Sequence, residues 1–381
     1  MKTLYFVAGE ASADNHGAAL MTSLRALQPD IRFSGRGGPQ MKSIAGAEFQ
    51  NWIDKSGVLG LWEVIKQYGY FRKQFRQALD EIERARPDAV VLIDYPGFNL
   101  RLARAISKRR SHPHIIYYIS PQVWAWNRGR IKKMARWLDL MLCIFPFEAE
   151  LYNKSGLRTV FVGHPMIERL GEKKIQVDRD PTLVGLFPGS RAREVRKIFP
   201  VLIETARKLC ESTPGLRFEV AAASEALARL MKTMLTAEDR HIAIKVGQTA
   251  EIMQRVFVGI VASGSATLEA AYFRMPFALV YKVAWPTYFV GRRLVKVKYL
   301  GMPNVLADKE VVPEFIQHRA QAAEIARAVG QLIDNSHTRQ TMIWEFDKIA
   351  AQLGGAGASE RAAREILAYR PARKCFTAGF E

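Results

Sequence analysis

Short apolar runs alternate along the chain with segments in which apolar residues recur at helical spacing. The strand-like runs cover residues 3–8, 89–93, 115–119, 140–144 and 160–162, and then residues 183–187, 218–222, 242–246, 256–261 and 277–280. Strands that alternate with helices predict a parallel α/β sheet. Because the pattern occurs twice, the sequence predicts two α/β domains of similar architecture.

The boundary between the two domains is predicted in the polar segment 171–180, which is rich in charge and precedes Pro181. Such a composition is typical of a linker. The N-terminal domain would then contain residues 1–170 and the C-terminal domain residues 181–340. Apolar residues continue at helical spacing after residue 340, which predicts helices at the end of the chain.

Residues 256–269 combine a strand, a turn and the start of a helix. After the apolar run, this segment contains Ser263, Gly264, Ser265, Ala266, Thr267 and Glu269. The first turn of a helix leaves backbone N–H groups unpaired and favours phosphate. Glu269 would then accept hydrogen bonds from sugar hydroxyls, as a nucleotide requires at its ribose. From this segment alone, an ordinary turn with a capping serine is an equally good interpretation.

A second turn of this kind follows residues 183–187, where Gly189, Ser190 and Arg191 precede another helical segment. Gly189 would let the backbone approach a phosphate, and Arg191 could pair with it in a forked geometry. A capped helix with a solvated basic face is the alternative. Two such turns in one domain favour a diphosphate site. Tyr281, after a further strand, could pack on a base or simply end the strand.

Three segments that follow strands of the first domain carry candidate substrate-binding residues. They contain Glu10 and Ser12, then Asp94 and Asn99, and then Gln122 and Trp124. Open α/β sheets bind ligands outside the carboxyl ends of their strands. Asp94 could therefore act as a general base toward a substrate hydroxyl, or could cap the turn that follows it. Trp124 could shape a pocket, although core packing is the commoner role of such a residue.

The chain carries 56 Lys and Arg against 37 Asp and Glu, a net charge of +19. This charge attracts nucleic acid, anionic lipid or phosphorylated substrates. Residues 62–76 and 285–299 mix aromatic and basic side chains, which suits a membrane interface or nucleic acid, although a helix with a solvated basic face is the default. No run approaches the length of a membrane span, and the first apolar run is too short for a signal peptide.

Metal and disulfide chemistry are not expected. The three cysteines are scattered, which predicts a reducing compartment and no disulfide framework. Asp178 and Asp180 have the spacing of a metal-binding pair but lie in the predicted linker. We therefore assign no metal.

Together these motifs resemble one family, the lipid-A-disaccharide synthases, over nearly the whole chain. The resemblance rests on GEAS at 9–12, DYPGFN at 94–99, SPQVWAW at 120–126, PGSR at 188–191, SGSATLE at 263–269 and PN at 303–304, in the family's order. It implies a GT-B architecture, in which two Rossmann-like domains face each other across a cleft. It also implies that helices near residues 341–370 return to the N-terminal domain.

The activity that the resemblance implies is that of an inverting, metal-independent glycosyltransferase. It would join UDP-2,3-diacylglucosamine to 2,3-diacylglucosamine 1-phosphate (lipid X), giving the β-1,6-linked lipid A disaccharide 1-phosphate and UDP. Matched position by position, Asp94 is the catalytic carboxylate, and Arg191, Glu269 and Asn304 matter for UDP binding or activity. Ala13, where the family usually has glycine, and the unusual His16 are departures in the first loop.

The partners implied by the resemblance are lipids. The protein would lie in the cytoplasm on the inner face of the bacterial inner membrane, held by the stretches 62–76 and 285–299, with no nucleic-acid partner. A homodimer is an alternative to a monomer. Two other functions stay open: a UDP-N-acetylglucosamine-type transferase or epimerase with a soluble substrate, and, with less support, a basic nucleic-acid-binding protein.

Overall fold

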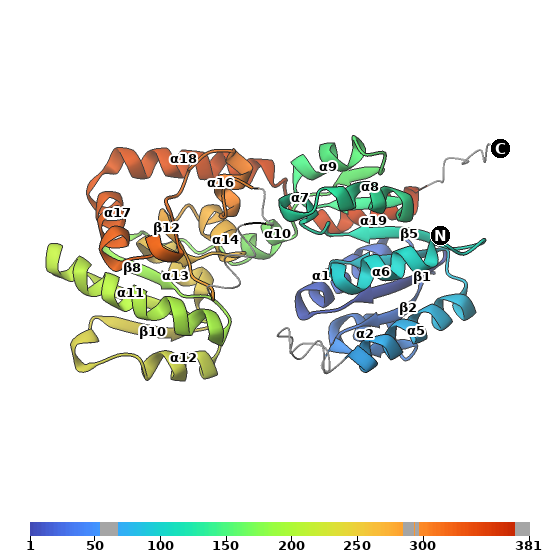
Figure 1. The fold of residues 1–381 in the computed structure, drawn as a ribbon, viewed down its shortest axis with the longest axis horizontal. Helices are drawn as coiled ribbons and strands as arrows, with labels where there is room; N and C mark the ends of the chain where they lie inside the picture. Colours follow the sequence, from blue (N-terminus) through green and yellow to red (C-terminus); the bar gives the residue numbers. More distant parts are fainter. Residues whose placement is uncertain (54–67, 285–292, 294–296, 370–381) are drawn as a thin grey trace. The chain divides into compact units, whose positions relative to one another are not determined.

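The protein forms two compact units in the computed structural model, which describes residues 1–53, 68–284, 293 and 297–369 (Figure 1). Unit 1 consists of Met1–Pro165 together with the chain from Leu353 onward, and unit 2 consists of Met166–Gln352. Each unit contains its own sheet, and every strand pairing in both sheets is parallel. This is the repeated α/β architecture that the sequence predicts.

The sheet of unit 1 has seven strands in the order β3-β2-β1-β4-β5-β6-β7. The strands are β1 (Thr3–Ala8), β2 (Arg32–Gly37), β3 (Phe49–Asn51), β4 (Ala89–Ile93), β5 (His114–Tyr118), β6 (Leu140–Cys143) and β7 (Thr159–Phe161). All five residues of β4 are buried, because helices cover both faces of the sheet. Neither β2 nor β3 is among the predicted strand-like runs, because β2 is largely polar and rich in glycine and β3 has only three residues, two of them polar.

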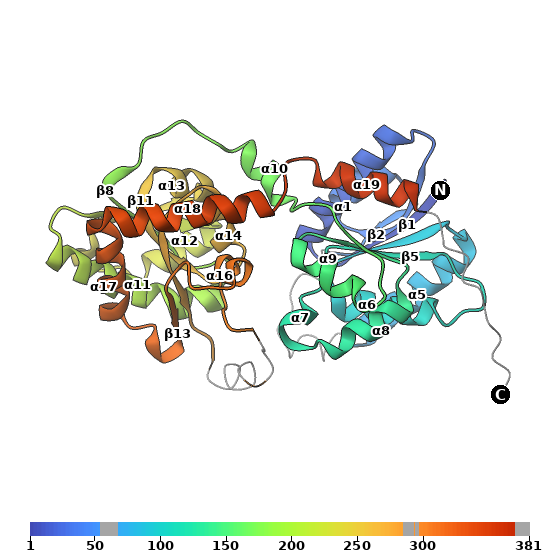
Figure 2. The ribbon, with the colours of Figure 1, turned by 90° about the horizontal axis from the view of Figure 1, so that it is seen from above.

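Two layers of helices cover this sheet (Figure 2). One hydrophobic core lies beneath α1 (Ala11–Leu27), α2 (Pro39–Ala45) and α19 (Ala358–Ala368). The other lies beneath α5 (Tyr68–Ala85), α6 (Pro96–Ile106), α8 (Gly129–Trp137) and α9 (Pro146–Asn153), with the short α7 (Val123–Trp126) before α8. The end of the described chain therefore belongs to unit 1, as the family resemblance implies.

The sheet of unit 2 has six strands in the order β10-β9-β8-β11-β12-β13. The strands are β8 (Asp180–Phe187), β9 (Arg217–Ala222), β10 (Ile242–Val246), β11 (Val256–Ala262), β12 (Phe277–Tyr281) and β13 (Glu314–Ile316). The helices are α10 (Met166–Gly171), α11 (Ala192–Ser212), α12 (Glu225–Lys232), α13 (Thr249–Arg255), α14 (Ala266–Tyr272), α16 (Met302–Ala307), α17 (Ala322–Asp334) and α18 (Ser336–Gln352). The five strands predicted for this domain are all present.

The prediction that the helices from about residue 341 return to the N-terminal domain is wrong for α18. This helix packs on α14, α16 and α17 within unit 2, where Phe346 stacks on Phe277 at 5.7 Å between ring centroids. Of the helices at the end of the chain, α19 is the one that packs on α1 in unit 1. Its Arg361 donates a hydrogen bond to the carbonyl of Val162 at 2.8 Å. The boundary lies at Leu353, because the apolar face of α18 is buried in unit 2.

The segment 171–180 is not a free linker between the units. Gln254 accepts a hydrogen bond from the amide of Ile175 and donates to the carbonyl of Lys173. Arg179 donates to the carbonyls of Met253 and Val256. Because these bonds attach the segment to α13 and β11, it belongs to unit 2, and so does α10, which the sequence placed in the N-terminal domain.

Candidate functional site

A cavity of about 560 Å³ lies at the carboxyl ends of β8, β9, β10 and β11 in unit 2. The strand order reverses there, since β9 and β10 continue outward from β8 whereas β12 and β13 continue outward from β11. Open α/β sheets bind ligands in the crevice at such a reversal. The volume falls in the range of small-molecule sites. The cavity is therefore a strong candidate ligand site of unit 2.

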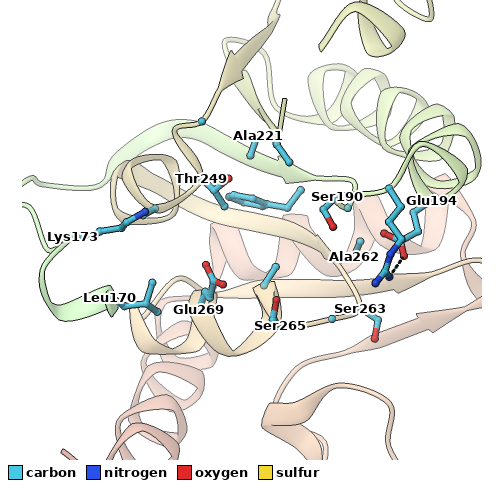
Figure 3. Close-up of a pocket in the computed structure, with 18 of the residues that line it drawn as sticks. Leu170, Lys173, Ser190, Glu194, Ala221, Thr249, Ala262, Ser263, Ser265 and Glu269 are labelled. Carbon is cyan, nitrogen blue, oxygen red and sulfur yellow. Dashed lines mark hydrogen bonds and ion pairs between the residues drawn. The ribbon is translucent and has the colours of Figure 1, made fainter. Parts of the chain in front are cut away.

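Both turns that the sequence predicts as phosphate sites open into this cavity. Its lining includes Gly189, Ser190 and Arg191 after β8, and Ser263, Gly264, Ser265, Ala266 and Glu269 around the start of α14. Figure 3 shows Ser190 and Glu194 on one side of the cavity, and Glu269 with Leu170 and Lys173 on the opposite side. Turns about 75 residues apart in sequence thus face one space, as a diphosphate site would require.

The turn after β8 depends on a glycine. Gly189 has a φ of +106°, and a Cβ at this position would lie 2.7 Å from Oε2 of Glu194. Arg191 donates from Nη1 to Oε1 of Glu194 at 2.9 Å, although its side chain is 80% exposed. An exposed ion pair of this kind is weak. The guanidinium can therefore leave Glu194 for a phosphate at little cost in free energy.

In the turn before α14, only some of the backbone N–H groups of residues 263–267 are free to bind a phosphate. The amide of Ser263 donates to the carbonyl of Val280, and that of Thr267 donates to Gly264. In the described part of the chain the amides of Gly264 and Ser265 have no protein acceptor. Thr267 is fully buried and its hydroxyl also donates to Gly264, so it supports the turn from beneath and does not line the cavity.

Glu269 lies inside the cavity and is paired with a residue that the sequence did not implicate. Its Oε1 accepts from Nη2 of Arg169 at 2.9 Å, and its side chain is 15% exposed. Arg169, Leu170 and Lys173 all line the cavity. They were missed because the sequence places them in the other domain and in the linker, and no local motif marks them.

Besides Thr267, two more residues predicted to bind the nucleotide do not line the cavity. Tyr281 ends β12 and is partly buried, which raises the pKa of its hydroxyl, with a further contribution from the charge of Glu194. Asn304 is fully buried. Its amide donates to Val312 and Glu314, and its oxygen accepts from Val311 and Val312. The Asn304 side chain therefore holds its own loop, and it has no polar atom left for a ligand.

Asp94 lies at the corresponding point of unit 1. The strand order of that sheet reverses between β1 and β4, whose ends pair at Ala8 and Ile93. Glu10 follows β1 as the residue before α1, and Asp94 follows β4. The structure thus brings two of the predicted substrate-site carboxylates to the reversal point of this sheet.

The backbone of Asp94 is held in an unusual conformation. Asp94 has a φ of +44° and Tyr95 a φ of +48°, which residues with a side chain adopt rarely. The Asp94 amide donates to Tyr118, and its carbonyl accepts from the hydroxyl of Tyr117 and from Nδ2 of Asn99. Strain of this kind persists where the surroundings fix it, commonly at functional sites.

The electrostatic setting of Asp94 suits a general base. Partial burial and, to a smaller extent, the charge of Glu10 together raise the pKa of Asp94 to about 6, against the opposing effect of the Tyr95 N–H. A base is most effective when its pKa lies close to the operating pH. The carboxylate would therefore be ionised near neutral pH and yet more basic than an ordinary aspartate.

Of the other residues predicted in this site, two are structural. Asn99 is fully buried, and its amide donates to the carbonyls of Ile93 and Asp94, so it fixes the Asp94 loop. Trp124 is buried and donates from Nε1 to Oε1 of Glu148 at 2.9 Å. The core interpretation of Trp124 is therefore the correct one.

The remaining two predicted residues are accessible to a ligand. Gln122 is exposed after β5. Ser12 is exposed and its hydroxyl donates to Glu10 at 2.9 Å. A substrate that reaches Asp94 could therefore contact polar groups of the first loop.

The described residues contain no membrane-spanning helix and no metal-binding cluster. Residues 62–67 and most of 285–299 lie outside the described part of the chain, while 68–76 belong to α5. None of the helices within the described ranges is long and apolar enough to cross a membrane. Within the same ranges, no three His, Cys, Asp or Glu side chains gather in a way that could hold a metal ion.

Comparison with known families identifies the chain. The family described as lipid-A-disaccharide synthetase matches residues 4–366. The chain belongs to this family. The lipid-A-disaccharide synthase of Geobacter metallireducens is 37% identical over 96% of this chain and 97% of its own. The family resemblance drawn from the motifs is therefore confirmed.

Solved structures with a similar fold include UDP-GlcNAc 2-epimerases and glycosyltransferases. The UDP-GlcNAc 2-epimerase of Neisseria meningitidis superposes with a TM-score of 0.62, at 12% identity, over 96% of this chain and all (100%) of its own. The calicheamicin glycosyltransferase CalG4 has a TM-score of 0.57 at 14% identity, covering 97% of this chain and 98% of its own. At such identities the likeness concerns the fold alone, and it confirms the predicted fold class.

Proposed function

We propose that the protein transfers the diacylglucosamine unit of a UDP-linked lipid donor to the 6-hydroxyl of diacylglucosamine 1-phosphate. The product would be the β-1,6-linked lipid A disaccharide 1-phosphate, and UDP would leave. Membership of the lipid-A-disaccharide synthetase family supports this reaction. The structural observation that carries it is the single cavity into which the two predicted phosphate turns open.

The donor would bind in unit 2. The amides of Gly264 and Ser265 and the first turn of α11 supply N–H groups and the positive end of a helix dipole for the diphosphate. Arg191 would exchange Glu194 for a phosphate oxygen. Glu269, held by Arg169, would accept hydrogen bonds from the ribose hydroxyls.

The acceptor would react beside Asp94 in unit 1. As its 6-hydroxyl oxygen forms a bond to the anomeric carbon of the donor, the bond from that carbon to the UDP oxygen breaks. The hydroxyl proton passes to Asp94, and the electron pair leaves with UDP. One displacement inverts the anomeric centre. Arg191 and the backbone amides would stabilise the charge on the departing diphosphate, so we propose that no metal is needed.

The protein would act at the cytoplasmic surface of the inner membrane, where both lipid substrates reside. Its net charge of +19 favours an anionic bilayer surface. The stretches 62–76 and 285–299, which lie largely outside the described residues, remain proposed contacts with that surface. We infer no nucleic-acid partner, and a homodimer stays an alternative to a monomer.

Release of UDP is the direct test of this function. The four combinations of acylated and deacylated donor and acceptor would be compared in neutral detergent micelles. Rapid release only when both substrates are acylated would support a lipid substrate pair. Equal rates with deacylated sugars would instead favour an enzyme of soluble UDP-sugars, and no release with any pair would overturn the proposal.

A further inference from the structure

A second cavity, of about 570 Å³, lies between α6 and α8 on the outer face of unit 1. We call it the α6–α8 groove, and it is lined by Pro96, Gly97, Leu100, Arg101, Arg104, Lys108, Arg130, Lys133, Arg136 and Trp137. Six of these ten residues are cations and none is acidic. The groove plays no part in the reaction described above, so its charge needs a separate explanation.

The charge of the groove belongs to a larger asymmetry in the sequence. Residues 95–138 contain no Asp or Glu. The same segment carries ten cations, Arg101, Arg104, Lys108, Arg109, Arg110, Arg128, Arg130, Lys132, Lys133 and Arg136. About half of the net charge of +19 therefore comes from one stretch of 44 residues, and the fold of unit 1 places six of its ten cations around one groove.

The groove cations have no carboxylate partner among the residues that the structure describes. No carboxylate of the described residues pairs with any of the six groove cations, whereas neighbouring Arg109 pairs with Glu83 at 3.4 Å. Like charges held together without counter-ions repel one another and lower stability. An anionic partner that binds in the groove would offset this repulsion, which would explain why the cations are placed together.

The apolar part of the groove points to a lipid surface as that partner. Leu100 is buried in the core, whereas the partly exposed Trp137 lies among the cations, with Arg104 over its indole at 5.9 Å. Next to the groove, Trp126 is 40% exposed and carries Arg130 over its ring at 5.2 Å. Tryptophan beside Arg and Lys is typical of the boundary between headgroups and acyl chains.

We propose that the α6–α8 groove docks the protein onto the headgroups of anionic phospholipids. Six cations around one groove carry more charge than one soluble phosphate would need, which suits a surface of many anionic headgroups better. RNA fits less well, because each of the two indoles already has a guanidinium over its ring.

The position of the groove would let a docked bilayer deliver the acceptor lipid to Asp94 in the proposed reaction. One end of it is formed by Pro96 and Gly97, which follow directly after the loop of Asp94 and Tyr95. A bilayer bound there would meet the same edge of unit 1 at which the acceptor lipid must reach Asp94. This use rests on the proposed function, whereas the docking itself can be measured without any substrate.

Binding to vesicles is the test, with the full chain and no sugar lipid present. Wild-type protein should bind vesicles of phosphatidylcholine with roughly 30% phosphatidylglycerol, and binding should weaken as salt rises. Neutralising three groove cations, in Arg104→Gln/Lys133→Gln/Arg136→Gln, should lower the partition coefficient about a hundredfold. Vesicles of pure phosphatidylcholine should bind every variant poorly.

Two further variants separate the groove from net charge and from folding. Arg229→Gln/Lys232→Gln/Arg240→Gln removes the same charge from exposed sites in unit 2 and should bind as the wild type does. Arg104→Lys/Lys133→Arg/Arg136→Lys keeps the charge of the groove and should also bind. Equal losses in the two neutralised variants would overturn the proposal, because net charge alone would then explain the binding.

Lysine acetylation of the wild-type protein, measured with and without vesicles, tests the proposal even if a variant fails to fold. Anionic vesicles should protect Lys108 and Lys133 from acetylation and leave exposed Lys232 reactive. Unchanged reactivity of Lys108 and Lys133 would overturn the proposal, as would tighter binding to RNA than to vesicles at equal ionic strength. Because no substrate is present, loss of docking is distinguishable from absence of UDP release in the activity assay.

Discussion

The Glu10 carboxylate raises the pKa of Asp94 from the end of the adjacent strand, β1, and adds to the effect of burial. Glu10 is exposed, whereas Asp94 is partly buried, so burial acts mainly on Asp94. The result is a pKa of about 6 for Asp94. The charge of Glu10 therefore contributes, after burial, to the basicity of the proposed base.

The pH profile tests this relationship. Asp94 must be ionised to accept a proton, so kcat/KM should rise with pH up to about 6 and then level off. Glu10→Gln removes the repulsion between the carboxylates of Glu10 and Asp94 and should lower the pKa of Asp94. The rise of kcat/KM with pH, which we call the acidic limb, should then occur at lower pH. Asp30→Asn, at an exposed site, should leave the limb in place. A limb that stays fixed in Glu10→Gln would contradict the proposed coupling.

Asp94→Asn should abolish turnover while sparing the nucleotide site. Loss of a general base typically lowers kcat by about 10²–10⁴-fold. Asparagine tolerates the positive φ of +44°, so the loop should keep its shape. Calorimetry should show wild-type affinity for UDP, because Asp94 belongs to unit 1 and the cavity to unit 2. Turnover close to that of the wild type would remove Asp94 as the base.

Glu269→Gln should weaken binding of UDP roughly tenfold or more, because a hydrogen bond to a charged acceptor becomes a neutral one. The effect should depend on the ribose. Wild-type protein should prefer UDP to its 2′-deoxy and 3′-deoxy analogues, and the variant should lose at least one of these preferences. If Glu269→Gln discriminates between the three ligands as the wild type does, Glu269 does not contact the ribose.

Gly189→Ala should damage the phosphate turn. The φ of +106° is strained for alanine, and the new Cβ would lie 2.7 Å from Oε2 of Glu194. We expect weaker UDP binding and a lower Tm. Gly330→Ala is the matched control, because a Cβ there meets nothing within 4 Å in the middle of α17. It should keep UDP affinity and raise stability by up to about 1 kcal/mol. Unchanged affinity in Gly189→Ala would exclude a close approach of phosphate to this turn.

Glu148 should make stability depend on pH. Burial raises the pKa of Glu148 from its ordinary 4.5 to about 7, against the N–H groups of Trp124 and Phe145. The native state then binds more protons than the unfolded state between these values, so stability should fall as pH rises from about 4.5 to about 7. Glu148→Gln should reduce the fall in Tm between pH 5 and pH 7. Some fall should remain, because the pKa of Asp94 is raised as well. An identical slope in wild type and variant would contradict this prediction.

The sequence predicts the strands because each is a local apolar run, and it predicts the two turns as candidate phosphate sites because glycine and serine follow those runs directly. β2 was missed because its sequence, RFSGRG, is largely polar and rich in glycine, and it is recognisable only from its pairing with β1. Asn99 and Trp124 are candidates for binding because they follow strand ends, with core packing as the commoner role of Trp124, and Asn304 is a candidate only through the family resemblance. Burial, which depends on the whole fold, makes all three structural.

The sequence by itself determined the α/β repeat, the two phosphate turns, the candidate base and the family, because each depends on residues close together in the chain or on motifs in order. Only the tertiary structure decided that the turns share one cavity, that α18 belongs to unit 2, and that Arg169 pairs with Glu269 across 100 residues of sequence. It also gathered the cations of α6 and α8 into one groove. The reason is that strand order and helix packing bring distant residues together, and local composition does not encode that order.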